Sequence, residues 1–217
     1  MNDSSDLIQQ LRKLSVDCDF PGGNIIVDRI DGDTVFLRQD LRDTTEWWFY
    51  WYFRVQDAAG RTLTFQFTQG DVIGARGPAV STDGGATWRW LGCEAVTDQA
   101  FTYTFAPDAA DVRFSFSLPY VERDLQAFLA RYRAVAGVRT EVLCQTRAGR
   151  PVEVLHFGAP RDAASSLALL TCRHHACESV ASYVLEGLMA TVLGADLQQA
   201  SSGDAAGLWL RDNVAFT

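Results

Sequence analysis

The first half of the chain alternates between apolar and polar residues with the period of two that is typical of β-strands. Residues 46–55, "EWWFYWYFRV", place large apolar side chains on one face of such a strand, namely Trp47, Phe49, Trp51, Phe53 and Val55. The other face has three aromatic residues and one arginine, namely Trp48, Tyr50, Tyr52 and Arg54. This pattern favours a central strand that is covered on both sides.

Three further stretches alternate in the same way, at residues 61–68, 101–105 and 112–118, with turn-forming Gly, Asp and Pro residues between them. Several short strands of this kind predict an antiparallel β-sandwich.

The stretch "STDGGATW", residues 81–88, matches the Asp-box pattern of sialidase-like propellers. It occurs once and without the period that propeller blades need, so we interpret it as the tip of a hairpin.

The pattern changes near Pro119. Residues 120–134 carry apolar side chains at the spacing of one helix face, namely Leu125, Phe128, Leu129 and Tyr132. Residues 140–146 and 150–158 are strand-like and flank a Gly-containing turn, which predicts a hairpin. Residues 166–172, "SLALLTC", form a continuous apolar run that is typical of a strand buried on both faces.

Residues 178–194 predict a helix that ends at Gly194 and has Val180, Val184 and Leu188 on one stripe. Residues 201–213 predict another helix, and residues 214–217 the first part of a strand. Strand, helix, helix, strand is the order found in α/β domains. We therefore predict a mixed α+β and α/β chain, with an antiparallel β-sandwich at residues 1–122 and the first part of an α/β domain at residues 123–217. Since residues 214–217 resemble the start of a buried strand, we expect the chain to end within that domain.

Composition narrows the possible partners. With 19 Lys and Arg against 27 Asp and Glu, and a net charge of −8, the chain has no basic footprint for nucleic acid or an anionic membrane. The N-terminus does not resemble a signal peptide, and no apolar stretch is long enough to span a bilayer. We expect a cytoplasmic protein whose five cysteines are reduced thiols.

The stretch "TCRHHACESV", residues 171–180, concentrates side chains that bind zinc. His175 and Glu178 are three residues apart, between a predicted strand and a predicted helix. Ligands collect at the carboxyl ends of strands in open α/β sheets, and one turn there can supply two adjacent zinc ligands. A third protein ligand would have to come from elsewhere. The alternative is that Glu178 is a first-turn helix acid and His175 a hydrogen-bonded loop residue.

Two other interpretations of the same stretch stay open. Cys172, His174 and Cys177 could form a thiolate-rich structural zinc site, although their spacing differs from that of zinc fingers. Cys177 could instead be a nucleophile whose pKa is lowered at the N-terminus of the predicted helix.

Several motifs together resemble the M14 family of metallocarboxypeptidases, particularly its cytosolic type. "ALLTCRHHACESVASYVLEGLM" is similar to that family's first zinc-binding segment, in which an apolar strand leads into Arg-x-His-Pro-Gly-Glu and a helix. Arg173, His175, Glu178 and Gly187 fall on the family's arginine, histidine, glutamate and helix glycine. "LPYVERDLQAFL", "LCQTRAGRPVEVL" and "WWFYWYFRV" resemble its interdomain segment, its Leu-Cys-x-Thr-x-x-Gly hairpin and its sandwich strand. The motifs follow in family order from about residue 35 onward, with Ala176-Cys177 in place of Pro-Gly.

The resemblance implies that His175 and Glu178 are two zinc ligands of an enzyme that hydrolyses C-terminal peptide bonds of peptides or proteins. The third ligand, the residues that bind the substrate carboxylate and the general-base glutamate lie further along in the family, so no catalytic residue is assigned within this chain. We expect the chain alone to be inactive and its zinc binding to be weak or absent. His156 matches no family ligand and is interpreted as structural.

A different function is also consistent with the sequence. The aromatic-rich sandwich could bind a peptide or glycan without catalysis, with the α/β segment as a remnant. An exposed row of Trp48, Tyr50 and Tyr52 would favour this interpretation, and their burial would favour a plain core. In either case an open sheet edge could pair with a second copy, so a homo-oligomer is a further expectation.

Overall fold

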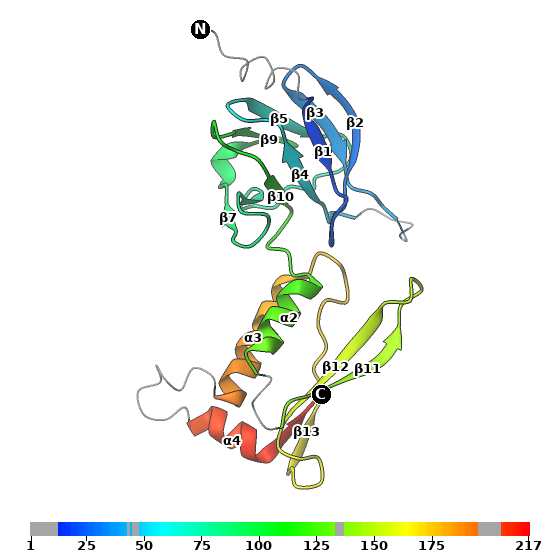
Figure 1. The fold of residues 1–217 in the computed structure, drawn as a ribbon, viewed down its shortest axis with the longest axis vertical. Helices are drawn as coiled ribbons and strands as arrows, with labels where there is room; N and C mark the ends of the chain where they lie inside the picture. Colours follow the sequence, from blue (N-terminus) through cyan, green and yellow to red (C-terminus); the bar gives the residue numbers. More distant parts are fainter. Residues whose placement is uncertain (1–12, 43, 45–47, 133–136, 195–204) are drawn as a thin grey trace. The chain divides into compact units, whose positions relative to one another are not determined.

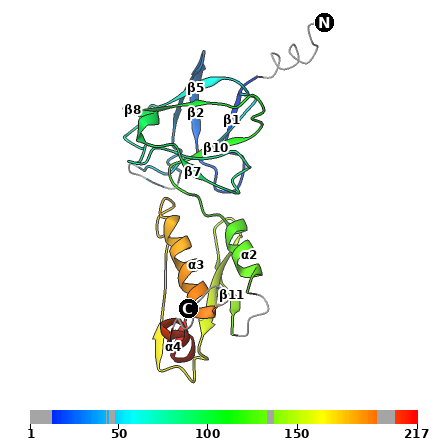
Figure 2. The ribbon, with the colours of Figure 1, turned by 90° about the vertical axis from the view of Figure 1, so that its left-hand side faces the viewer.

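The computed structural model describes residues 13–42, 44, 48–132, 137–194 and 205–217. The chain divides into two compact units, Met1–Pro119 and Tyr120–Thr217, which are described separately below (Figures 1 and 2). None of the helices in these ranges has the length and apolar character needed to cross a membrane.

Unit 1 contains two five-stranded sheets. The first has the order β1-β4-β10-β6-β7, with strands Ser15–Asp17, Tyr52–Gln56, Val112–Ser115, Ala79–Ser81 and Arg89–Trp90. The second has the order β2-β3-β5-β9-β8, with strands Ile26–Asp31, Thr34–Arg38, Thr62–Phe67, Ala100–Thr104 and Val96–Thr97. A short 3-10 helix, η1, spans Cys93–Ala95. The strands pair antiparallel as expected, except that β3 and β5 are parallel.

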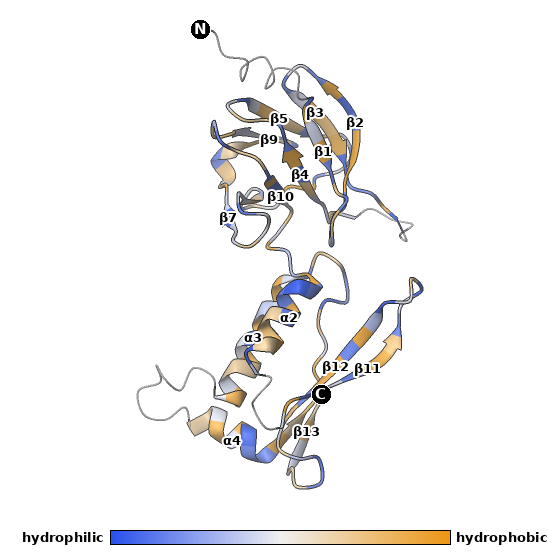
Figure 3. Ribbon diagram, in the orientation of Figure 1, coloured by the Kyte–Doolittle hydropathy of each residue, from blue (hydrophilic) through white to orange (hydrophobic). Residues whose placement is uncertain are grey.

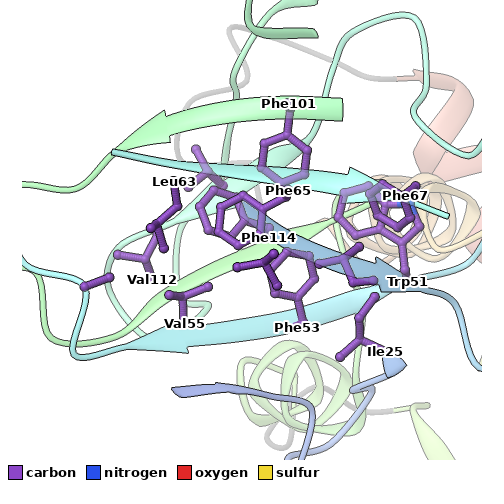
Figure 4. Packing of buried hydrophobic residues seen from close by; sticks show 14 of the residues in the cluster. Ile25, Trp51, Phe53, Val55, Leu63, Phe65, Phe67, Phe101, Val112 and Phe114 are labelled. Atoms are coloured by element: carbon purple, nitrogen blue, oxygen red, sulfur yellow. The ribbon is translucent and has the colours of Figure 1, made fainter. Parts of the chain in front are cut away.

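The predicted alternation is clearest in β5, where Leu63, Phe65 and Phe67 are buried and the residues between them are more exposed (Figure 3). Both sheets contribute side chains to one core, in which Phe65 of β5 contacts Phe53 of β4 and Phe114 of β10 (Figure 4). Ring centroids in these two pairs are 5.3 and 5.1 Å apart. Tilted aromatic rings therefore join the two sheets.

The strand predicted at residues 46–55 is shorter in the structure, where β4 starts at Tyr52. Residues 45–47 of the predicted strand lie outside the described ranges. β4 pairs with β1 and β10, so it is internal to its sheet as predicted. Trp51, Phe53 and Val55 are buried toward the core. The other face of the strand is also covered at Tyr52, whose ring lies 4.7 Å from Phe20.

The Asp-box stretch forms the turn of the antiparallel hairpin β6–β7, as the sequence predicts. The Asp83 carboxylate accepts hydrogen bonds from the Ser81 and Thr87 hydroxyls and from the backbone N–H groups of Ala86 and Thr87. These bonds, of which the Thr87 hydroxyl bond contributes most, lower the pKa of Asp83. Trp88 Nε1 donates to the Gly85 carbonyl at 3.2 Å, which closes the turn.

Unit 2 combines a four-stranded mixed sheet, of order β11-β12-β14-β13, with three helices. Its elements in chain order are α2 (Glu122–Ala130), β11 (Arg139–Gln145), β12 (Pro151–Gly158), β13 (Ser166–Ala168), α3 (Val180–Leu193), α4 (Ala205–Asn213) and β14 (Val214–Phe216). The predicted hairpin and the predicted order of strand, helix, helix, strand are both present. β14 pairs antiparallel with β12 and parallel with β13.

The three helices pack on one face of this sheet. Phe128 of α2, Met189 of α3 and Phe157 and Phe216 of the sheet form the centre of a second core. Phe157 and Phe216 stack with centroids 4.7 Å apart. Gly194 adopts a φ of 70° and ends α3, as the sequence predicts.

One prediction about burial in unit 2 is wrong, and a second is wrong in part. The apolar run at residues 166–172 is not covered on both faces, since Leu167 and Leu169 are 62% and 75% exposed. The stripe predicted on α3 is only partly its buried face. Leu188 packs against the core, but Val180 and Val184 are 48% and 66% exposed, while Met189 and Val192 are buried. The cause is that α3 is apolar around most of its circumference (Figure 3), so periodicity cannot identify which side is covered.

Candidate metal site

The candidate ligands lie in the connection between β13 and α3. This segment continues alongside β14, because the Leu170 N–H donates to the Thr217 carbonyl at 2.7 Å. It then turns at residues 175–178, where the Glu178 N–H donates to the His175 carbonyl at 3.1 Å. Helix α3 begins at Val180, later than the position near Cys177 that the sequence suggested, so Glu178 precedes the helix.

His175 and Glu178 are in direct contact. The His175 ring nitrogen Nδ1 lies 2.9 Å from Glu178 Oε1, and the His175 backbone N–H donates to Oε2 at 3.2 Å. Hydrogen bonding from the His175 side chain is the main reason that the pKa of Glu178 is lowered. Both side chains are accessible, with 59% and 43% of their surfaces exposed. The turn therefore presents an imidazole and a carboxylate to solvent as a pair.

The donor types fit zinc, but the described part of the chain supplies only a partial site. Two ligands about 2.0–2.2 Å from a tetrahedral zinc are separated by about 3.3–3.6 Å, so the 2.9 Å pair would need to open by about 0.4–0.7 Å. Across the described ranges, no group of three or more His, Cys, Asp or Glu side chains is arranged to hold a metal ion. His175 and Glu178 can thus serve as two ligands of a site whose remaining ligands come from elsewhere.

The Arg173 side chain forms hydrogen bonds that stabilise the turn. Its backbone has a positive φ of 57°. Its Nη1 donates to the Tyr120 carbonyl, and its Nε and Nη2 lie 3.4 and 3.3 Å from the Ala176 carbonyl. One guanidinium group therefore connects the turn of the candidate ligands to Tyr120, two residues before the start of helix α2.

Tyr120 is itself fixed by α3. Its hydroxyl donates to Glu186 Oε1 at 2.8 Å, and its ring meets the edge of Tyr183 with centroids 5.1 Å apart. Burial, followed by the bond to Glu186, raises the pKa of Tyr120 well above its usual range, so the hydroxyl stays protonated. Sequence patterns do not predict this contact. The "LPY" segment was the available signal, but its partner is 66 residues away.

The other candidate ligands of the stretch, His174 and Cys172, lie within hydrogen-bonding distance of neighbouring hydroxyl groups. His174 Nε2 lies 3.1 Å from the Thr171 hydroxyl, and Cys172 Sγ lies 3.8 Å from the Ser182 hydroxyl. With Cys177 they do not form a metal-binding group in the ranges described, so the thiolate-rich site is not supported.

The interpretation of Cys177 as a nucleophile is wrong about the direction in which its pKa is shifted. Burial raises the pKa of Cys177, whereas the interpretation required a lowered pKa. The cysteine precedes α3 and is partly shielded from solvent, and desolvation of the thiolate outweighs the other influences. His156, interpreted as structural, has Nδ1 3.0 Å from the Thr217 hydroxyl and Nε2 3.4 Å from Glu141 Oε2.

A cavity of about 260 Å³ lies next to this segment, between α2, α3 and the sheet. Its lining is largely apolar, with Leu125 and Met189 from the helices and Leu155 from β12. Cys172 and Glu186 also line it. The cavity lies beside the candidate ligand segment, but neither His175 nor Glu178 is part of its wall.

Comparison with other proteins gives the fold a wider context. No protein-family model matches the chain. An uncharacterized protein of Zymomonas mobilis is 25% identical over 182 residues, which cover 81% of this chain and 46% of that protein. A metallo-carboxypeptidase from Burkholderia cenocepacia has a similar structure, with a TM-score of 0.77, 24% identity, and coverage of 94% of this chain and 54% of that one. A candidate carboxypeptidase from Burkholderia mallei gives a TM-score of 0.79 at 24% identity, with coverage of 97% and 54%.

The chain thus spans about half the length of the proteins it matches. Sequence identities in this range support a shared fold rather than a shared activity. The chain shares the fold of the matched part of these solved structures, which is about half of their length.

Proposed function

We propose that this chain corresponds to the first part of a zinc metallo-carboxypeptidase of the M14 type, and that its complete form hydrolyses C-terminal peptide bonds. The observation that carries the proposal is the contact between His175 and Glu178, 2.9 Å apart, on a fold that resembles metallo-carboxypeptidases over 94% of the chain. In this proposal the N-terminal β-sandwich, predicted at residues 1–122, corresponds to unit 1. The beginning of the catalytic domain, predicted at residues 123–217, corresponds to unit 2, whose first residue is Tyr120. The cytosolic type remains the preferred subfamily because of the motif order.

His175 would provide a ring nitrogen and Glu178 a carboxylate oxygen to zinc. When bound, zinc would polarise the scissile carbonyl and lower the pKa of a water ligand. We assign no general base in this chain and expect it to have no peptidase activity alone. A panel of peptides would test this, and chelator-sensitive release of C-terminal residues would contradict it.

The alternative of a binding module receives little support. Tyr50 and Tyr52 are only 7% and 3% exposed, and Trp48 is half-buried. Tyr52 contacts Phe20 and Trp88 at 4.7 and 5.4 Å. These aromatic residues are therefore used mainly in packing within unit 1.

Zinc titration of the 217-residue chain tests the proposed site. The chain has three histidines, so nitrogen-15 NMR can follow each imidazole separately. We expect weak but saturable zinc binding that shifts the His175 signals. His175→Ala and Glu178→Gln, measured by isothermal titration calorimetry because the first variant lacks that imidazole, should weaken this binding by at least about tenfold. His174→Ala is the matched control and should leave the affinity unchanged. Equal zinc affinity in wild type, His175→Ala and Glu178→Gln would refute the site.

A further inference from the structure

Arg173 has an unusual backbone for its residue type. Among described non-glycine residues, three have a positive φ: Asp57, Asp98 and Arg173. Aspartate tolerates this region because its short side chain can bond locally, whereas arginine gains no such benefit. A conformation of this kind persists only where surrounding contacts stabilise it, and such residues concentrate at functional sites.

The compensating contacts come from the guanidinium group. It bonds to two carbonyls, that of Tyr120 and that of Ala176. Ala176 lies inside the turn that His175 and Glu178 close with their own backbone bond. A planar group with several donors can bond to both carbonyls at once, which a lysine ammonium cannot reproduce in the same geometry.

Tyr120, which accepts the bond from Arg173, is itself held in place by burial and by contacts with α3. It is 7% exposed, its hydroxyl bonds to Glu186, and its ring packs against Tyr183. The side chains of His175 and Glu178, in contrast, are 59% and 43% exposed. Their placement therefore depends on how the turn itself is held.

We propose that Arg173 is a positioning residue that sets the geometry of the His175–Glu178 pair by clamping the Ala176 carbonyl to the Tyr120 carbonyl. It touches neither metal nor substrate and acts through the turn. The inference rests on the proposed zinc site, because the function it serves is metal binding. Supporting contacts of this kind typically alter metal affinity by 10–100-fold.

The test uses zinc titration of the full chain, followed by NMR of the His175 imidazole. Arg173→Gly removes the clamp and tolerates the positive φ, so it separates loss of the contacts from backbone strain. Arg173→Lys keeps the charge and loses the planar group. Met189→Ala, in the core of unit 2, serves as a control for lost stability away from the turn. Circular dichroism establishes that each variant is folded at the temperature used.

We expect both Arg173 variants to bind zinc at least about tenfold more weakly, with Met189→Ala close to wild type despite a lower melting temperature. If Arg173→Gly does not fold, Arg173→Lys alone decides the question. Wild-type affinity in the folded Arg173 variants would overturn the proposal, as would an equal loss of affinity in Met189→Ala. If His175→Ala and Glu178→Gln also bind like wild type, the zinc site itself fails rather than the role of Arg173.

Discussion

At the scale of single residues, the turn that carries His175 and Glu178 is held by contacts with residues far away in the sequence, such as the bond from Arg173 to the Tyr120 carbonyl. Sequence spacing was sufficient to place His175 beside Glu178, because three residues of one turn determine that contact. It could not find that Tyr120 bonds to Glu186, since this depends on how α3 packs. Nor could it show that burial raises the pKa of Cys177, because desolvation follows from tertiary structure.

The bond between Tyr120 and Glu186 makes a prediction at this scale. Tyr120→Phe removes the hydroxyl donor and leaves a partly buried carboxylate with one fewer partner. We expect the free energy of unfolding of unit 2 to fall by about 1–2 kcal/mol, measured by denaturant titration. Tyr103→Phe in unit 1 is the matched control. An unchanged unfolding midpoint for Tyr120→Phe would show that the bond contributes nothing.

At the scale of elements, alternation and turn residues predicted most strands and helices well. β5, the β11–β12 hairpin and the end of α3 at Gly194 all follow from local sequence. Local sequence did not predict which face is buried in segments that are apolar on all sides, because no polar face marks the side toward solvent. This explains the errors for residues 166–172 and for the stripe of Val180 and Val184.

The Asp83 turn gives a pH-dependent prediction for unit 1. Hydrogen bonds from Thr87 and Ser81 stabilise the ionised carboxylate, so its folded pKa lies below its unfolded pKa. Such a group contributes stability above its unfolded pKa of about 4, and this is lost as pH falls toward the folded pKa. Asp83→Asn should therefore destabilise unit 1 at pH 7 and differ less from wild type in acid.

Thermal unfolding at several pH values measures this difference. Thr97→Ser, on strand β8 and away from the turn, is a control that keeps the carboxylate. A constant difference between Asp83→Asn and wild type from pH 7 down to pH 3 would contradict the assignment.

At the scale of the whole molecule, the two units differ in how completely they cover their apolar residues. Ten large hydrophobic residues of the described ranges are exposed, and all except Ile30 belong to unit 2. A groove of about 800 Å³ follows its sheet, with Leu167 and Leu169 in the lining. Exposed apolar surface of this kind favours association, and on this basis we propose that the chain self-associates.

Charged substitutions on this surface test that expectation. We predict that Leu167→Lys with Leu169→Lys reduces concentration-dependent self-association, measured by analytical ultracentrifugation, without lowering the melting temperature. The matched control Ile30→Lys lies on unit 1 and should leave association unchanged. A wild-type chain that stays monomeric at all concentrations would contradict the prediction.

We propose that His175 and Glu178 are two ligands of one zinc ion. Anomalous diffraction at the zinc edge, from crystals of the chain soaked with zinc, tests it most directly. The account predicts a peak about 2.0–2.2 Å from both a His175 ring nitrogen and a Glu178 carboxylate oxygen. A zinc peak at Cys172 and Cys177, or no peak beside His175 and Glu178, would contradict it.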